Sequence, residues 1–76
     1  MNDKRPSQIS SIMITNREEV PLRVVVEPWA DERVVAPHKT VFISVEGPPG
    51  RLDIEHKSGE LVVYGWEGTI MSIVDD

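Results

Sequence analysis

Residues 51–64 read RLDIEHKSGELVVY, and this stretch indicates the fold class most clearly. Apolar and charged residues alternate in it on both sides of the turn pair Ser58-Gly59. Alternation with a period of two places apolar side chains on one face of a β-strand and charged side chains on the other. Glycine accepts the positive φ that a tight hairpin turn requires. The stretch therefore predicts a β-hairpin that exposes its charged row and buries Leu52, Ile54, Leu61 and Val63.

The same period of two recurs along the chain, and segments rich in Gly, Pro or polar residues interrupt it six times. Turn signals at intervals of roughly 8–12 residues are typical of antiparallel sandwiches and small barrels. We expect one all-β domain over residues 1–76, with a flexible tail over residues 1–7. Its fold is predicted to be an antiparallel β-sandwich or flattened barrel of about seven short strands. Six further side chains are predicted to be buried: Leu22, Val24, Val26, Val41, Ile43 and Val45.

Composition and charge exclude several classes of protein. The 76 residues contain no cysteine, so disulfides and thiolate metal sites are excluded. Thirteen acidic and eight basic side chains give a net charge of −5, and phosphate backbones repel such a surface. The N-terminus has no apolar run behind its charges. We therefore expect a soluble cytoplasmic protein that binds neither nucleic acid nor a membrane.

The residues that could carry catalysis or bind a metal are few. His38 and His56 are the two histidines, and eighteen positions separate them. Glu55 and His56 are adjacent, so a strand would direct them to opposite faces. No serine stands in a nucleophile motif, and no Gly-rich phosphate loop is present. The sequence therefore predicts no enzyme activity, no metal and no cofactor.

Two interpretations of the aromatic residues remain open. Trp29 and Trp66 each stand at the end of a strand-like run, where a large ring closes the end of a small core or faces a partner. Closing the core is favoured, because a small core needs all the apolar area available to it. The alternative is a carbohydrate or small-ligand site made of Trp29, Tyr64, Trp66 and Glu67. Tyr64 and Trp66 would share a face if the strand continued through Gly65.

Several motifs resemble small uncharacterised bacterial all-β proteins. The similarity begins in Ile14-Thr15-Asn16-Arg17 and Pro21-Leu22. It continues in a Glu-Pro-Trp motif (27–29), a Glu-Gly-Pro-Pro-Gly motif (46–50) and a Tyr-Gly-Trp motif (64–66). It covers most of the chain from Ile14 to Val74. These proteins have no assigned activity, so the resemblance implies a compact β-fold in a bacterium and no catalytic residues. Pro37-His38-Lys39 departs from their Pro-Gly corner.

We interpret the chain as a non-enzymatic interaction module that binds a protein partner or itself. The segments Ile9 to Thr15 and Thr69 to Val74 carry no charge, and uncharged edge strands are open to pairing. The hypothesis is a symmetric homodimer formed through one of these strands, or through a face that includes Met13 or Met71. The alternative is that the two segments pair with each other inside one monomer.

Overall fold

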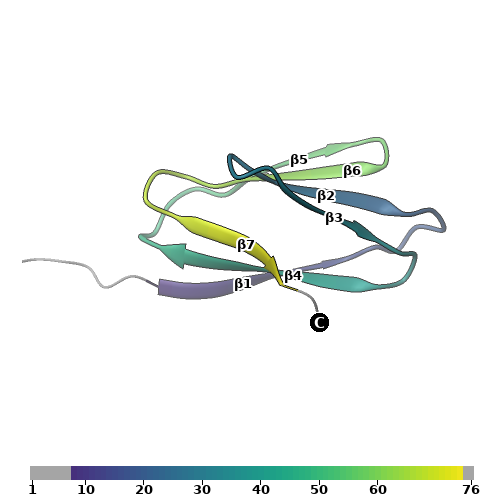
Figure 1. Ribbon diagram of the computed structural model, residues 1–76, viewed down its shortest axis with the longest axis horizontal. Coiled ribbons are helices and arrows are strands. Elements are labelled where there is room, and N and C mark those ends of the chain that lie inside the picture. The colour runs from purple at the N-terminus through teal and green to yellow at the C-terminus, as the bar shows by residue number, and fades with distance from the viewer. Residues whose placement is uncertain (1–7, 75–76) are drawn as a thin grey trace, which may run out of the picture.

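The structure is a computed structural model that describes residues 8–74, and it is a two-layer sandwich (Figure 1). This confirms the all-β prediction, while the tail predicted over residues 1–7 lies outside the described residues. The seven strands are β1 (Gln8–Thr15), β2 (Leu22–Glu27), β3 (Asp31–Val35), β4 (Thr40–Gly47), β5 (Asp53–Lys57), β6 (Glu60–Tyr64) and β7 (Ile70–Val74).

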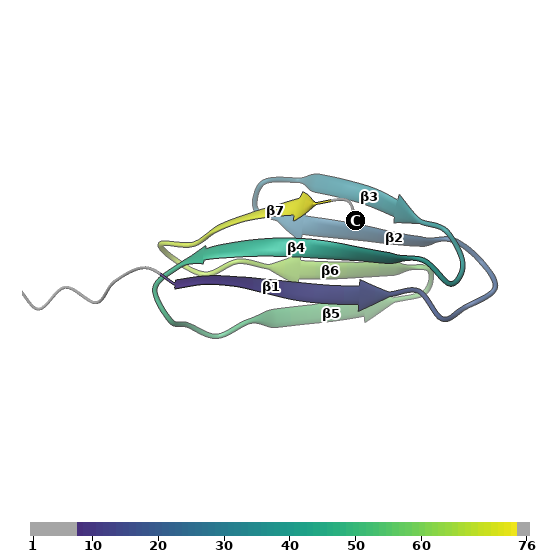
Figure 2. The same cartoon turned by 90° about the horizontal axis from the view of Figure 1, so that it is seen from below.

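One sheet has three strands in the order β1-β4-β7, and the other has four in the order β3-β2-β6-β5 (Figure 2). All the strand pairings are antiparallel except β2 with β6, which run parallel. That parallel pairing brings together two strands that are far apart in the sequence. No part of residues 8–74 forms a helix that is long and apolar enough to span a membrane.

The core lies between the sheets and consists largely of β-branched side chains. Val24, Val26, Val63 and Ile43 are completely buried, which confirms the burial predicted for these four residues. Leu22 and Leu61 are partly buried and pack against this core. The other buried side chains of the cluster are Ile14, Val35, Val41, Val45, Met71 and Ile73.

The predicted burial of Leu52 and Ile54 is wrong, because Leu52 is 37% exposed and Ile54 is 50% exposed. Ile54 pairs with the buried Val63, and directly paired residues point to the same face, so Ile54 does face the inner side of its sheet. What is missing is a covering layer. The three-stranded sheet is offset so that β7 packs over β3 and β2, which leaves the edge strand β5 without an opposing strand.

Asn16 joins the two sheets at one end of the sandwich and is 1% exposed. Its side-chain amide donates to the carbonyl oxygens of Val20 at 2.8 Å and Val35 at 3.0 Å. Its side-chain oxygen accepts from the backbone N–H of Glu18 at 3.0 Å. A buried amide is stable only when such bonds are made. This residue therefore ties the end of β1 to the loop that follows it and to the end of β3.

Candidate functional site

The outer surface of the β1-β4-β7 sheet is the best candidate for a binding site. Strand alternation directs every second side chain away from the core, and the register places these side chains in cross-strand rows. We call this surface the β1-β4-β7 face. It consists of the outward residues Ile9, Ser11, Met13, Thr15, Thr40, Phe42, Ser44, Glu46, Ile70, Ser72 and Val74.

Three rows cross the full width of this face. One is apolar and consists of Met13, Phe42 and Val74. The next is a ladder of three serines, Ser11, Ser44 and Ser72. The third places Glu46 between Ile9 and Ile70. The face is therefore made of short or apolar side chains arranged in register.

Four apolar residues of the face are well exposed, with exposed fractions of 79% at Ile9, 66% at Met13, 63% at Ile70 and 46% at Val74. Within the described strands of this sheet, Glu46 is the one charged side chain that points outward. Single exposed apolar residues are ordinary on protein surfaces, whereas several gathered on one sheet face with little charge among them indicate an interaction site.

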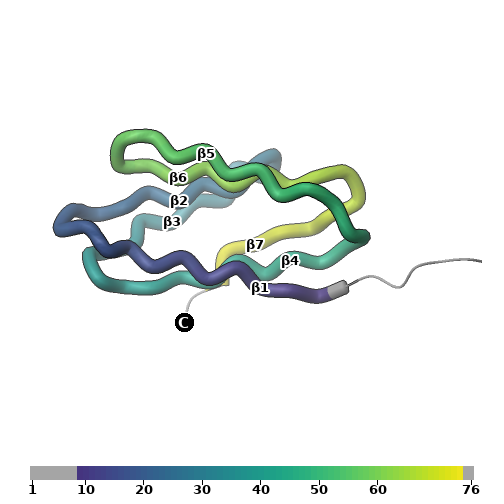
Figure 3. The backbone as a smooth tube through the Cα atoms, turned by 180° about the vertical axis from the view of Figure 1, so that it is seen from behind, coloured from purple at the N-terminus to yellow at the C-terminus, as the bar shows by residue number. Residues whose placement is uncertain are grey.

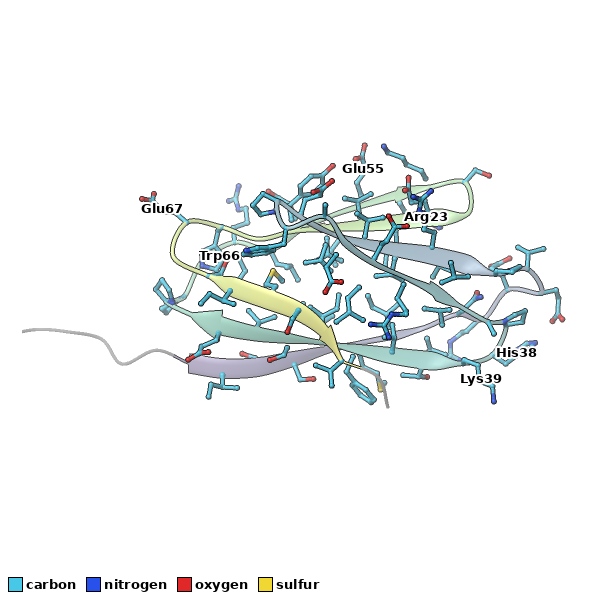
Figure 4. The ribbon with its side chains drawn as sticks, in the orientation of Figure 1. Arg23, His38, Lys39, Glu55, Trp66 and Glu67 are labelled. Atoms are coloured by element: carbon cyan, nitrogen blue, oxygen red, sulfur yellow. The ribbon has the colours of Figure 1, made fainter. Side chains whose placement is uncertain are left out.

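The outer surface of the four-stranded sheet is charged instead. Arg23 donates to both carboxylate oxygens of Glu32, at 2.9 and 3.2 Å, and lies 3.9 Å from Glu60. Lys57 lies 3.9 Å from Glu55. Figure 4 shows Arg23 and Glu55 on this side of the molecule, away from the core. The two outer faces of the sandwich therefore differ in chemistry, and the difference points to different roles.

Val25 and Val62 are buried on this charged surface, with exposed fractions of 8% and 6%. They form one row with Glu32 and Glu55 at its ends. Long charged side chains cover apolar surface with their stems, and we attribute the burial of both valines to them. The continuous apolar runs at residues 24–26 and 61–63 were the sequence signal for strands covered on both faces.

Tyr64 donates its hydroxyl to the carboxylate of Glu55 at 2.9 Å on the same surface. This hydrogen bond favours the neutral phenol and raises the pKa of Tyr64 above its ordinary 10.0. The bond therefore contributes to stability below the ordinary pKa, and that contribution is lost as the pH rises through the raised value.

Tyr64 is the one tyrosine of the sequence, so its titration can be followed by tyrosinate absorbance. We expect its pKa to be higher in the folded protein than in urea, and Glu55→Gln to lower it in the folded protein. Glu67→Gln should leave it unchanged. An unaltered titration midpoint in Glu55→Gln would contradict the assigned hydrogen bond.

The residues of the alternative ligand site are not brought together on one face. β6 ends at Tyr64, so the condition for a shared face with Trp66 is not met. Trp66 packs against the core, and its indole N–H donates to the carbonyl of Pro48 at 2.9 Å. Trp29 is 39% exposed and lies against Gly65, where an added Cβ would stand 2.6 Å from the ring. Glu67 points away from the end of the sandwich (Figure 4).

The two histidines have different surroundings. The His38 ring nitrogen lies 3.0 Å from a carboxylate oxygen of Glu19, and both side chains are exposed. His56 borders a hollow of about 290 Å³ together with Leu22 and Gly59. Across residues 8–74, no three histidine or acidic side chains form a group that could hold a metal ion.

The two uncharged segments do become edge strands, but they do not pair with each other, because β4 lies between β1 and β7. The alternative of mutual pairing is therefore wrong. Met71 is 2% exposed and faces the core, so a face that includes Met71 is wrong as well. Met13 lies on the β1-β4-β7 face.

Comparison of the chain with protein-family models, with curated proteins and with solved structures finds no match.

Proposed function

We propose that the chain is a non-enzymatic interaction module that associates with a second copy of itself through the β1-β4-β7 face. The observation that carries this proposal is the asymmetry between the two outer surfaces. One is covered by ion pairs, and the other exposes four large apolar residues beside a single carboxylate. Contact through this face, where Glu46 is the one outward charge of the described strands, also leaves the other charged side chains of each copy in solvent.

The rows of the face are compatible with two-fold symmetry. A two-fold axis that crosses the strands at Ser44 places the serine ladder of one copy on that of the other. It also places the apolar row through Phe42 against the row through Glu46. An axis along the strands would instead bring the two copies of Glu46 together. Like charges in contact are unfavourable, so we infer the first arrangement.

The size of the face sets the expected affinity. Three strands about 4.8 Å apart and eight residues rising about 3.3 Å each cover roughly 14 by 26 Å, which is about 370 Å² of flat surface. A specific interface of standard size buries about 800 Å² on each partner. We therefore expect a weak dimer that dissociates on dilution.

Light scattering over a dilution series tests the proposal. The wild-type mass should rise from 8.6 kDa toward twice that value as the concentration increases. Ile70→Lys should remain a monomer, because a lysine at that position would be buried at the interface. Val34→Lys is the matched control, since Val34 is also 63% exposed but lies on the four-stranded sheet.

A wild-type mass of 8.6 kDa at every concentration would contradict the dimer. Equal association of the Ile70→Lys and Val34→Lys variants would contradict the assignment of the face. The small-ligand alternative stays a prediction, and it would now depend on Trp29 and Tyr64, whose rings are the exposed ones.

A further inference from the structure

The sandwich is open along the side between β1 and β5. β5 and β1 lie in opposite layers (Figure 3), and Figure 2 shows β5 beyond β1, as expected where four strands face three. Ile12 and Ile54 face inward here, and Ile54 is 50% exposed because no strand covers it. We call this open side the β1/β5 seam. Hollows of about 230 Å³ next to Ser10 and about 290 Å³ next to His56 lie toward its two ends.

The free edge of β1 presents a regular set of backbone groups to this seam. The N–H of Asn16 donates to the carbonyl of Lys39 at 2.9 Å, so Asn16 directs its N–H toward β4. Hydrogen-bonded and non-hydrogen-bonded pairs alternate along an antiparallel ladder. The peptide groups that point away from β4, toward the open side, are therefore those of Ile9, Ser11, Met13 and Thr15.

The other edge of this sheet is closed by a side chain. The same alternation across β4 directs the N–H of Ile73 to the open side of β7, and there it donates to the carboxylate of Asp31 at 3.1 Å. The edge strands of the four-stranded sheet, β3 and β5, carry charged residues that discourage pairing. Among the described edge strands, β1 has no charged residue within residues 9–15, and no side chain of residues 8–74 caps its free backbone groups as Asp31 does on β7.

We propose that the β1/β5 seam accepts an extended segment of a partner protein, which pairs with β1 as a fourth strand of the β1-β4-β7 sheet. Such a strand would bond to the four outward peptide groups of β1 and would cover Ile54. The side chains that β1 and β5 direct toward the seam include Ile12, Ile54 and His56, and none of them is acidic, lysine or arginine. The partner segment therefore alternates apolar residues, which face the seam, with polar residues that face solvent.

A single strand fits this edge better than a folded second copy does. A copy that paired through its own β1 would carry its own β5 into the seam, because β5 projects beyond β1 in each molecule (Figure 2). The two β5 strands would then occupy the same space. The seam is thus a different surface from the β1-β4-β7 face, and it takes a different partner.

Amide hydrogen exchange with a synthetic peptide tests the proposal on the full chain. The probe is Lys-Thr-Val-Thr-Val-Thr-Val-Thr-Lys, and its control is the same peptide with every valine and threonine N-methylated, which blocks pairing along either edge of the peptide. In the free protein, the amides of Ile9, Ser11, Met13 and Thr15 should exchange faster than those of Ser10, Ile12 and Ile14. The unmethylated peptide at ten times its dissociation constant should slow those four amides by about tenfold.

Two variants at one position separate strand pairing from other effects. Ser11→Pro removes an N–H that bonds to nothing within the sheet, so the fold should persist while the peptide no longer binds. Ser11→Ala keeps that N–H and should bind as the wild type does. Equal binding by both variants, or protection confined to Phe42 and Val74 on the β1-β4-β7 face, would overturn the proposal. So would slow exchange of the four amides in free monomeric protein, or no protection at any soluble peptide concentration.

Discussion

Replacing Asn16 by alanine is expected to lower the free energy of unfolding by about 3 kcal/mol. The substitution removes three side-chain hydrogen bonds and leaves the buried carbonyl of Val35 without its donor. A domain of this size has a total stability of only about 4–11 kcal/mol, so the loss is a large part of it. Urea unfolding at neutral pH, followed by tryptophan fluorescence, measures the change.

Two further variants identify the cause of this loss. Asn16→Asp keeps the acceptor for the Glu18 N–H but directs a carboxylate oxygen at two carbonyl oxygens. This variant should therefore be at least as unstable as Asn16→Ala at neutral pH. Acid should restore part of its stability, because the protonated carboxyl can donate. Arg17→Ala, at an exposed neighbour, should change stability by less than about 0.5 kcal/mol. A loss below about 1 kcal/mol in Asn16→Ala would show that water replaces the side chain.

Ile43→Ala is expected to lower the free energy of unfolding by about 4 kcal/mol. Ile43 is completely buried at the centre of β4, and its partners in the register are Ile12 on β1 and Ile73 on β7. Removing its side-chain carbons leaves a cavity between the two sheets, because the surrounding side chains are closely packed and relax into the space only in part. The same urea experiment measures this effect.

Ile54→Ala is the matched comparison and should cost about 1 kcal/mol, because half of the Ile54 side chain is already in water. The sequence pattern alone predicts similar costs at the two positions, since both isoleucines lie on the apolar face of an alternating strand. Equal destabilisation by the two substitutions would mean that β5 is covered in solution. In that case the open β1/β5 seam would not exist in the free protein.

The candidate site was only partly predictable. The absence of charge in residues 9–15 and 69–74 was visible in the sequence, and it indicated β1 and β7 as possible contact strands. Which side chains of these strands face outward depends on the register with β4, and that register buries Met71 while exposing Met13. The sequence does not reveal the serine ladder, because its three members come from strands far apart in the chain.

The aromatic residues show the same limit. The sequence predicts Trp29 and Trp66 at strand ends, and the structure confirms this, because the Gly and Pro residues that end a strand act locally. Whether a ring enters the core depends on what lies beside it. Trp66 does so because Gly50 has no side chain and the carbonyl of Pro48 accepts its N–H. Neither neighbour is close to Trp66 in the sequence.

The all-β class, the seven strands and the inward side of each alternating run are predictable from local sequence. These features depend on strand periodicity and turn residues, which act over a few neighbouring positions. Three features depend on the tertiary arrangement: β2 and β6 run parallel, Ile54 is uncovered, and the β1-β4-β7 face holds none of the ion pairs found within residues 8–74. The exposure of Ile54 follows from the offset between a three-stranded and a four-stranded sheet, whereas the parallel pairing and the make-up of the face follow from which strands become neighbours. All three are set by contacts between residues distant in the chain, which no local pattern reports.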